Sequence, residues 1–95
     1  MNLSETEYRL LAIMGGNERS GREIAKLFRD ETGKAISYGT LYTSFRRLAE
    51  KGFVRVRDDE DQDGRIRFFR ITGAGFSTLI DARTHYSQLA ALAAS

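Results

Sequence analysis

The segment SYGTLYTSFRRLAEK, residues 37–51, decides the fold that this sequence predicts. Ser37 can cap a helix that begins at Tyr38, and Gly52 is expected to end it. The apolar residues recur at i, i+4 and i+7, the spacing of a helix face that packs on a core: Leu41, Phe45 and Leu48. The sequence therefore predicts a helix with one buried side and one outer side.

The outer side of this helix is small, polar and cationic over its first two turns. A helix has the width that the DNA major groove admits, and arginine can bind a guanine edge or a phosphate there. Small residues allow close approach to the DNA backbone, and threonine can meet a phosphate or a thymine methyl group. We therefore expect the cap and the outer residues to contact double-stranded DNA: Ser37, Tyr38, Gly39, Thr40, Tyr42, Thr43, Arg46 and Arg47.

Two more helices are predicted upstream, each opened by a serine with a glutamate three residues later. This pairing is a capping box, in which the serine and the glutamate each bond a free amide of the first turn. The two boxes predict helices over residues 4–14 and 20–32. On the second helix, Arg22 and Lys26 point away from the apolar stripe and are expected to flank the DNA.

The first of these helices is apolar on two sides, and a helix of that kind must be covered on both. One side can pack on the core of the domain. The other side is expected to face a second subunit through Leu10, Ile13 and Met14.

A β-hairpin is predicted after the third helix. FVRVR (53–57) alternates apolar and basic residues, which is the period of a strand with one solvated face, and RIRFFRI (65–71) is the returning strand. Residues 58–64 are expected to form a seven-residue loop between them. Phe69 breaks the alternation of the second strand, which indicates a bulge or a strand end covered on both sides.

The charge is uneven along the chain, although the net charge is only +2. Residues 19–57 hold ten Lys and Arg against four Asp and Glu, whereas residues 58–63 hold five acids and no base. A basic segment favours a polyanionic partner, although it can also be a solvated surface. Arg65 and Arg67 lie near the hairpin turn and are expected to reach phosphates or the minor groove, with the five acids opposing them.

A long final helix is predicted from about Gly73 to Ala94, capped by Thr72. It would be ~33 Å long, which is too long to pack entirely on so small a domain. Its first apolar residues are expected to pack on the core: Phe76, Leu79 and Ile80. A second set has the alternating spacing of a coiled-coil seam of about two heptads: Leu79, Ala82, Tyr86, Leu89 and Ala93. This tail is expected to dock on a second subunit, or else to fray.

Composition and motifs exclude several classes of protein. The 95 residues suffice for one small domain and include no cysteine and one histidine, which excludes a thiol nucleophile and a Cys- or His-rich metal site. Neither a catalytic constellation nor a phosphate-binding loop is visible, and the acidic run lacks the spacing of a calcium loop. We expect a protein that is not an enzyme, without cofactor, metal or membrane span. The absence of a visible signal peptide indicates a cytoplasmic location.

Three stretches together resemble the winged-helix core of the PadR-like transcriptional regulators: SGREIAKLF (20–28), YGTLYTSFRRLAEKGFVRV (38–56) and GRIRFFRITGAG (64–75). The resemblance implies a homodimeric repressor whose C-terminal helices pair. Thr43 stands where the family usually has proline, and Ala49 where a glutamate is common. Some relatives bind aromatic or drug-like ligands at the dimer interface, so a small aromatic effector is a further partner that the resemblance implies, although no residue identifies one.

These observations predict a mainly α protein with a small β-hairpin. Residues 1–72 are expected to form a winged helix-turn-helix DNA-binding domain, and residues 73–95 a long C-terminal dimerisation helix in the same compact unit. The expected function is sequence-specific regulation of transcription by a homodimer that binds a pseudo-palindromic operator. The alternative is a winged-helix adaptor that binds another protein and never meets DNA.

Overall fold

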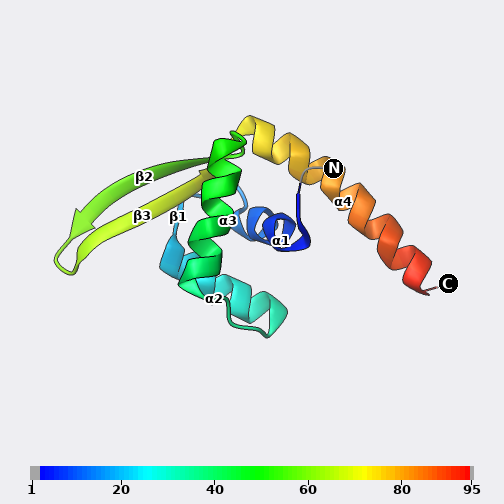
Figure 1. The fold of residues 1–95 in the computed structure, drawn as a ribbon, viewed down its shortest axis with the longest axis horizontal. Coiled ribbons are helices and arrows are strands. Elements are labelled where there is room, and N and C mark those ends of the chain that lie inside the picture. Colours follow the sequence, from blue (N-terminus) through cyan, green and yellow to red (C-terminus); the bar gives the residue numbers. More distant parts are fainter. Residues whose placement is uncertain (1–2, 95) are drawn as a thin grey trace.

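The computed structural model describes residues 3–94. The first two residues of the predicted unit 1–72 and the last residue of the predicted unit 73–95 therefore lie outside the described residues. The elements follow the order α1 (Glu5–Met14), β1 (Arg19–Ser20), α2 (Gly21–Thr32), α3 (Tyr38–Glu50), β2 (Val54–Asp61), β3 (Gly64–Ile71) and α4 (Gly73–Ala94). Figure 1 shows α1, α2 and α3 gathered at the centre, with the β2–β3 hairpin and α4 extending in opposite directions. The molecule is accordingly elongated, with extents of 52 × 28 × 21 Å.

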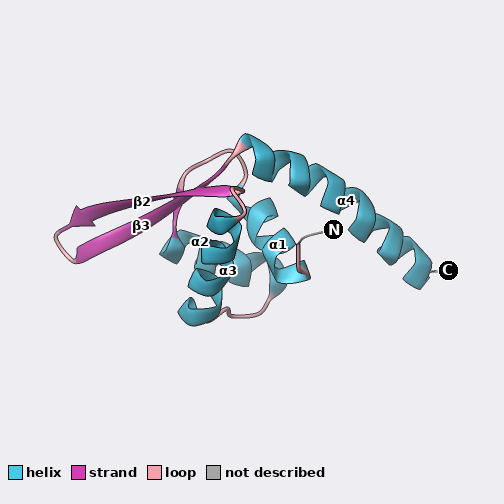
Figure 2. Ribbon diagram, turned by 45° about the horizontal axis from the view of Figure 1, so that its top comes forward, coloured by secondary structure: helices cyan, strands magenta, loops and turns pink. Residues whose placement is uncertain are grey.

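The helix ends are set by the residues that the sequence predicts. Both capping boxes are formed, with the Ser4 hydroxyl accepting from the Glu7 amide and the Ser20 hydroxyl from the Glu23 amide. Gly33 ends α2 in the left-handed conformation, at φ 73°, which a residue with a Cβ rarely adopts. The mainly α fold with a small sheet is confirmed (Figure 2).

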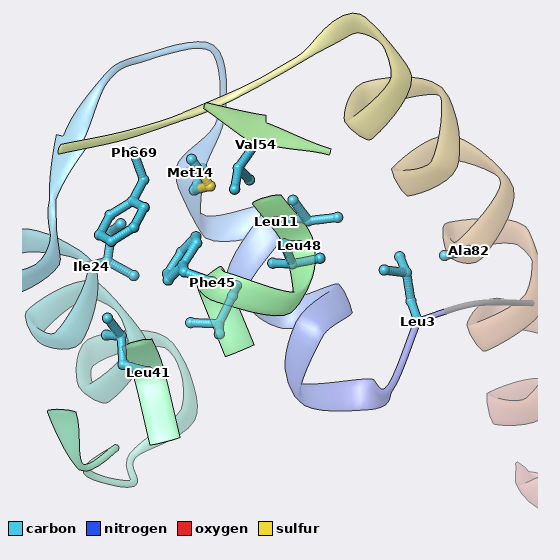
Figure 3. Close-up of a cluster of buried hydrophobic side chains, with 11 residues drawn as sticks. Leu3, Leu11, Met14, Ile24, Leu41, Phe45, Leu48, Val54, Phe69 and Ala82 are labelled. Atoms are coloured by element: carbon cyan, nitrogen blue, oxygen red, sulfur yellow. The ribbon is translucent and has the colours of Figure 1, made fainter. Parts of the chain in front are cut away.

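The core is centred on two stacked aromatic rings, Phe45 of α3 and Phe69 of β3. Their centroids lie 4.3 Å apart with an interplanar angle of 22°. Figure 3 shows apolar side chains from the helices and from β2 converging on this pair. The other fully buried large side chains are Leu10, Leu11, Met14, Ile24, Leu41 and Leu48. The predicted core face of α3 is thus confirmed, and it fixes which side of that helix points outward.

The prediction that α1 turns Leu10 and Met14 toward a second subunit is wrong. Both side chains are fully buried within their own chain, because α1 passes between α2, α3 and α4 and is covered on more than one side. Ile13 is half-buried and lines a groove between α1 and α2. The prediction that α1 is apolar on two sides and covered on both is confirmed, but both sides are covered by the same chain.

The sheet has three antiparallel strands in the order β1-β3-β2, and the short strand β1 was not predicted. β2 and β3 pair continuously from Val54 opposite Ile71 to Asp61 opposite Gly64, which leaves a two-residue turn instead of the predicted seven-residue loop and no bulge. The acids of β2 can extend the hairpin because two of them, Asp58 and Glu60, lie opposite Arg67 and Arg65, and opposite charges stabilise directly paired positions.

The helix α4 begins at a close joint with the sheet. The Thr72 hydroxyl donates to the carbonyl oxygen of Gly52 (2.6 Å) and accepts from the amide of Gly75 (3.0 Å). A Cβ built on Gly75 would lie 2.1 Å from the carbonyl oxygen of Phe53, so only glycine fits there. This joint fixes the direction in which α4 leaves the domain.

The faces of α4 differ from the prediction. Ala82 is fully buried against its own domain, and the half-buried Tyr86 donates its hydroxyl to the carbonyl oxygen of Leu3 (3.3 Å) and packs on Tyr8. The predicted intermolecular seam therefore packs within the chain up to Tyr86. Conversely, Phe76 and Ile80 were expected in the core but are 57% and 44% exposed.

Beyond Tyr86, α4 leaves the domain. Leu89 is 47% exposed and Leu92 72% exposed, and Ala93 is exposed as well. Of the predicted seam, Leu89 and Ala93 are the residues that stay uncovered in the single chain. Among the described residues, no helix combines the length and apolar character needed to cross a bilayer.

Candidate nucleic-acid interface

The helix α3 turns its whole predicted contact face to solvent. Its apolar side is held by Leu41, Phe45 and Leu48, each fully buried, so the opposite side must point outward. The predicted contact residues on this side are all exposed: Ser37, Tyr38, Gly39, Thr40, Tyr42, Thr43, Arg46 and Arg47. The structure thus brings these eight residues together on one helix and its cap.

The start of α3 is arranged to meet an anion. Ser37 caps it, its hydroxyl accepting from the Thr40 amide (3.1 Å) and donating to the Thr40 hydroxyl (3.0 Å). The amides of the first turn carry the positive end of the helix dipole, which favours negative charge such as a phosphate. Gly39 has no side chain to keep such a group away.

Two tyrosines border this end of α3. The rings of Tyr38 and Tyr42 stack with centroids 6.1 Å apart, and Tyr42 also lies 6.0 Å from Phe69 of the core. On its other side Tyr42 meets α2, because a Cβ built on Gly21 would lie 2.7 Å from the Tyr42 hydroxyl. Tyr42 is therefore braced against both the sheet and α2, while Tyr38 contacts Tyr42 and is 51% exposed.

The hairpin β2–β3, which we call the wing, carries Arg65 and Arg67 on the same sheet face as Phe69, because alternate residues of a strand share a face. The Arg67 guanidinium lies 5.8 Å from the centre of the Tyr42 ring. Both arginines donate to the carboxylate of Asp58, Arg67 at 3.1 Å. Hydrogen bonds from Arg65 and then Arg67 hold the pKa of Asp58 below its ordinary range.

A groove of about 520 Å³ separates the wing from the start of α3 and from α2. Arg22 lines it from α2, Tyr38 and Tyr42 from α3, and Arg65 and Arg67 from the wing. Five of the predicted cationic and aromatic contact residues, from α2, α3 and the wing, thus meet in one place. Lys26 is exposed on α2 but does not line this groove.

Sequence reasoning missed the residues that brace the back of the wing. Arg57 donates to Glu18 (2.7 Å) and to Asp59 (3.0 Å), and its guanidinium lies 4.6 Å from the centre of the Phe68 ring. The hydrogen bond from Arg57 lowers the pKa of Glu18. The alternation of the strands could have paired Arg57 with Phe68, but Glu18 is too distant in sequence for any local pattern to reveal it.

One further ion pair joins α1 to the residue that follows α3. Lys51, just after α3, donates to the carboxylate of Glu7 on α1 (3.3 Å), and Glu7 is only 6% exposed. Within residues 3–94, no group of three histidine, aspartate or glutamate side chains is placed to hold a metal ion. The exposed face of α3 presents cations, hydroxyls and aromatic rings.

Known structures share this fold. A PadR family transcription regulator from Clostridium difficile R20291 is 19% identical, with a TM-score of 0.79 and coverage of 94% of each chain. A transcriptional regulator from Clostridium thermocellum is 24% identical, with a TM-score of 0.81, covering 90% of this chain and 86% of that one. Bacillus subtilis PadR in complex with operator DNA is 22% identical, with a TM-score of 0.74, covering 82% of this chain and 47% of that one.

No curated protein matches the sequence. The family model described as the transcriptional regulator PadR-like family matches residues 10–81, which include α2, α3, the wing and the joint with α4. The stretches that resemble the family in sequence fall on those same elements. Because the match spans well over half of the sequence, the chain belongs to the PadR-like family of transcriptional regulators.

Proposed function

We propose that this protein is a homodimeric repressor that binds double-stranded DNA through α3 and the wing. The observation that carries the proposal is the division of α3 into a fully buried apolar side and an uncovered side of hydroxyls and arginines. A helix of that kind, fixed by its core face, can enter a major groove without disturbing the fold. Residues 1–72 then form the DNA-binding unit and residues 73–95 the dimerisation helix.

The charges around α3 support a polyanionic partner. Arg46 and Arg47 are exposed on its outer side, and Arg22 and Lys26 are exposed on α2. The cap at Ser37 adds the positive end of the helix dipole. Bacillus subtilis PadR, which shares the fold, is known in complex with operator DNA.

The end of α4 supports a dimer. Leu89 and Leu92 expose apolar surface that a second copy of the same helix can cover. Two copies related by a two-fold axis would read two half-sites about 10–10.5 base pairs apart, centre to centre, or a multiple of that spacing. The proposed operator is therefore pseudo-palindromic.

Selection of bound sequences from a random DNA pool tests the proposal most directly. We expect enrichment of inverted half-sites with the helical spacing of a dimer. Absence of any enriched sequence, together with absence of salt-sensitive binding to random duplex, would overturn it. Retention of a protein partner by a chain without DNA affinity would instead favour the adaptor alternative, and a reporter driven by the selected operator would establish whether binding represses.

The residues are tested by Arg47→Ala, measured by fluorescence anisotropy on the selected operator at several salt concentrations. If Arg47 contacts a phosphate, affinity falls and the slope of log K against log salt becomes shallower by about one. Arg9→Ala is the matched control, since it removes the same charge from α1, where no DNA contact is proposed. Equal behaviour of the two variants would remove Arg47 from the interface.

A further inference from the structure

A single carboxylate restrains two of the arginines of the wing, Arg65 and Arg67. Asp58 lies directly opposite Arg67 in the β2–β3 register and accepts its guanidinium at 3.1 Å. The same carboxylate accepts a hydrogen bond from Arg65, although Arg65 is directly opposite Glu60. Asp58 therefore holds Arg67, its direct cross-strand partner, and also takes Arg65, which lies opposite Glu60.

The end of the wing as a whole repels phosphate. Residues 57–67 carry three arginines and five acids, a net charge of −2, whereas residues 19–57 carry a net charge of +6. A DNA strand that approaches the wing without first docking on α3 meets carboxylates and arginines that are already paired. The arginines contribute to such an encounter only if they leave Asp58.

The groove gives these arginines a second place to act. Arg65 and Arg67 line it on one side, and Tyr38 and Tyr42 line it at the start of α3. A strand held by the outer face of α3 therefore runs beside two exposed arginines, Arg65 with 64% and Arg67 with 42% of its side chain exposed. At that position a phosphate can replace the carboxylate, since arginine binds either group through the same fork of donors.

We propose that Asp58 determines specificity by competing with DNA phosphates for Arg65 and Arg67, so that the wing adds binding only after α3 has docked. This inference rests on the proposed function. Its consequence is that wild-type protein has weak affinity for random DNA, because Arg65 and Arg67 are withheld from it. Removing the Asp58 charge should release them.

The test is Asp58→Asn, with binding to a random-sequence duplex measured over a range of salt. We expect affinity at low salt to rise about tenfold or more, and the slope of log K against log salt to steepen by about one to two as two more cations meet phosphates. Asp63→Asn is the matched control. It removes the same charge from the turn of the same hairpin, where none of the described ion pairs includes Asp63.

A second comparison isolates the arginines. In the Asp58→Asn background, Arg65→Ala with Arg67→Ala should return the affinity to that of the wild type or below it, and thermal melting of each variant confirms that it is folded. Weaker binding by Asp58→Asn would show that Asp58 positions the arginines for DNA, and an effect equal to that of Asp63→Asn would reduce it to net charge. Either result overturns the inference while the wild type still binds its selected operator, whereas a wild type without DNA affinity overturns the proposed function as well.

Discussion

The wing and the end of α4 are the two parts of this molecule that extend beyond the helical core, and they expose different kinds of side chain to water. In the wing, exposed charges pair with one another: Asp58 with Arg65 and Arg67, and Arg57 with Glu18 and Asp59. At the end of α4, by contrast, Leu89 and Leu92 are exposed and apolar. Figure 1 shows the two extensions on opposite sides of the core.

This difference indicates what each extension needs. A hairpin whose charged groups are paired can stand in water and can exchange one ionic partner for another. The exposed leucines of a helix end form no ion pairs, and burial of their apolar surface against another apolar surface is what stabilises them. This difference supports the proposed roles, with DNA as the partner of the wing and a second copy of the chain as the partner of the helix end.

The largest expected effect comes from Phe45→Ala, which leaves a cavity in the core from which the wing and α4 both extend. Phe45 is fully buried and stacks on Phe69, so truncation should cost about 3–5 kcal/mol of unfolding free energy. In a domain this small, that loss is most of the total stability. Urea denaturation measures it, and Phe45→Leu should lose clearly less. A loss well below about 3 kcal/mol in Phe45→Ala would mean that the aromatic stack is not the centre of the core.

The second prediction concerns the α4 end alone. Leu89→Ser combined with Leu92→Ser should weaken dimerisation by about 100-fold or more, because covering two leucines is worth about 3 kcal/mol at least. Sedimentation over a concentration series measures the shift from dimer to monomer. Because both side chains are exposed in the single chain, thermal stability of the monomer should change little.

The other exposed face of α4 supplies the matched control for that prediction. Phe76→Ser with Ile80→Ser removes a similar apolar area nearer the start of the helix, where both side chains are exposed. If this pair disrupts the dimer and the leucine pair does not, the interface lies along the face of Phe76 and Ile80. The start of α4, and not its end, would then be the apolar surface that contrasts with the charged wing.

The third prediction addresses the joint that holds the wing and α4 together. Gly75→Ala should destabilise the fold by about 1–3 kcal/mol, because the added Cβ meets the carbonyl oxygen of Phe53 and backbone must move. Gly73→Ala is the control two residues earlier, where a Cβ meets nothing within 4 Å. It should be neutral or slightly stabilising. Similar melting temperatures for the two variants would show that the joint is not tightly packed.

Much of the fold was predictable because the signals are local. The capping serines, the glycine after α2 and the i, i+4, i+7 spacing of α3 each act within one element, and these helix ends agree with the structure. Once the buried face of α3 is known, the opposite face must be the exposed one. The glycine that ends the family stretch 64–75 has a different cause, because Gly75 lies against the carbonyl oxygen of Phe53, which is distant in sequence.

The errors arose where a side chain could pack in more than one direction. Leu10 and Met14 looked like a second apolar face that needed a partner, but the chain covers both itself. The spacing of Leu79, Ala82 and Tyr86 fits an intermolecular seam and an intramolecular one equally well. The acids of β2 looked like a loop because strand propensity disfavours them, and only their pairing with β3 makes them a strand.

The smallest expected effect separates the partly buried ion pair of Glu7 and Lys51 from the exposed pairs of the wing. Burial raises the pKa of Glu7, but hydrogen bonds from Ser4 and Lys51 outweigh it and lower the pKa below its ordinary value of 4.5. A carboxylate with a lowered pKa stabilises the fold fully above that value, and the contribution is lost as the pH falls through the folded pKa. The urea midpoint should therefore fall on acidification below about pH 4.5.

Glu7→Gln tests the origin of that fall. The variant should be about 1 kcal/mol less stable than the wild type near neutral pH, since it loses a charged hydrogen bond to Lys51, and the difference should shrink in acid. Asp58→Asn is the control, because its pairs with Arg65 and Arg67 are exposed and exposed pairs add little to stability. A steeper acid response that depends on Asp58 and not on Glu7 would mean that the wing's ion pairs, rather than the link between α1 and the end of α3, hold the fold together.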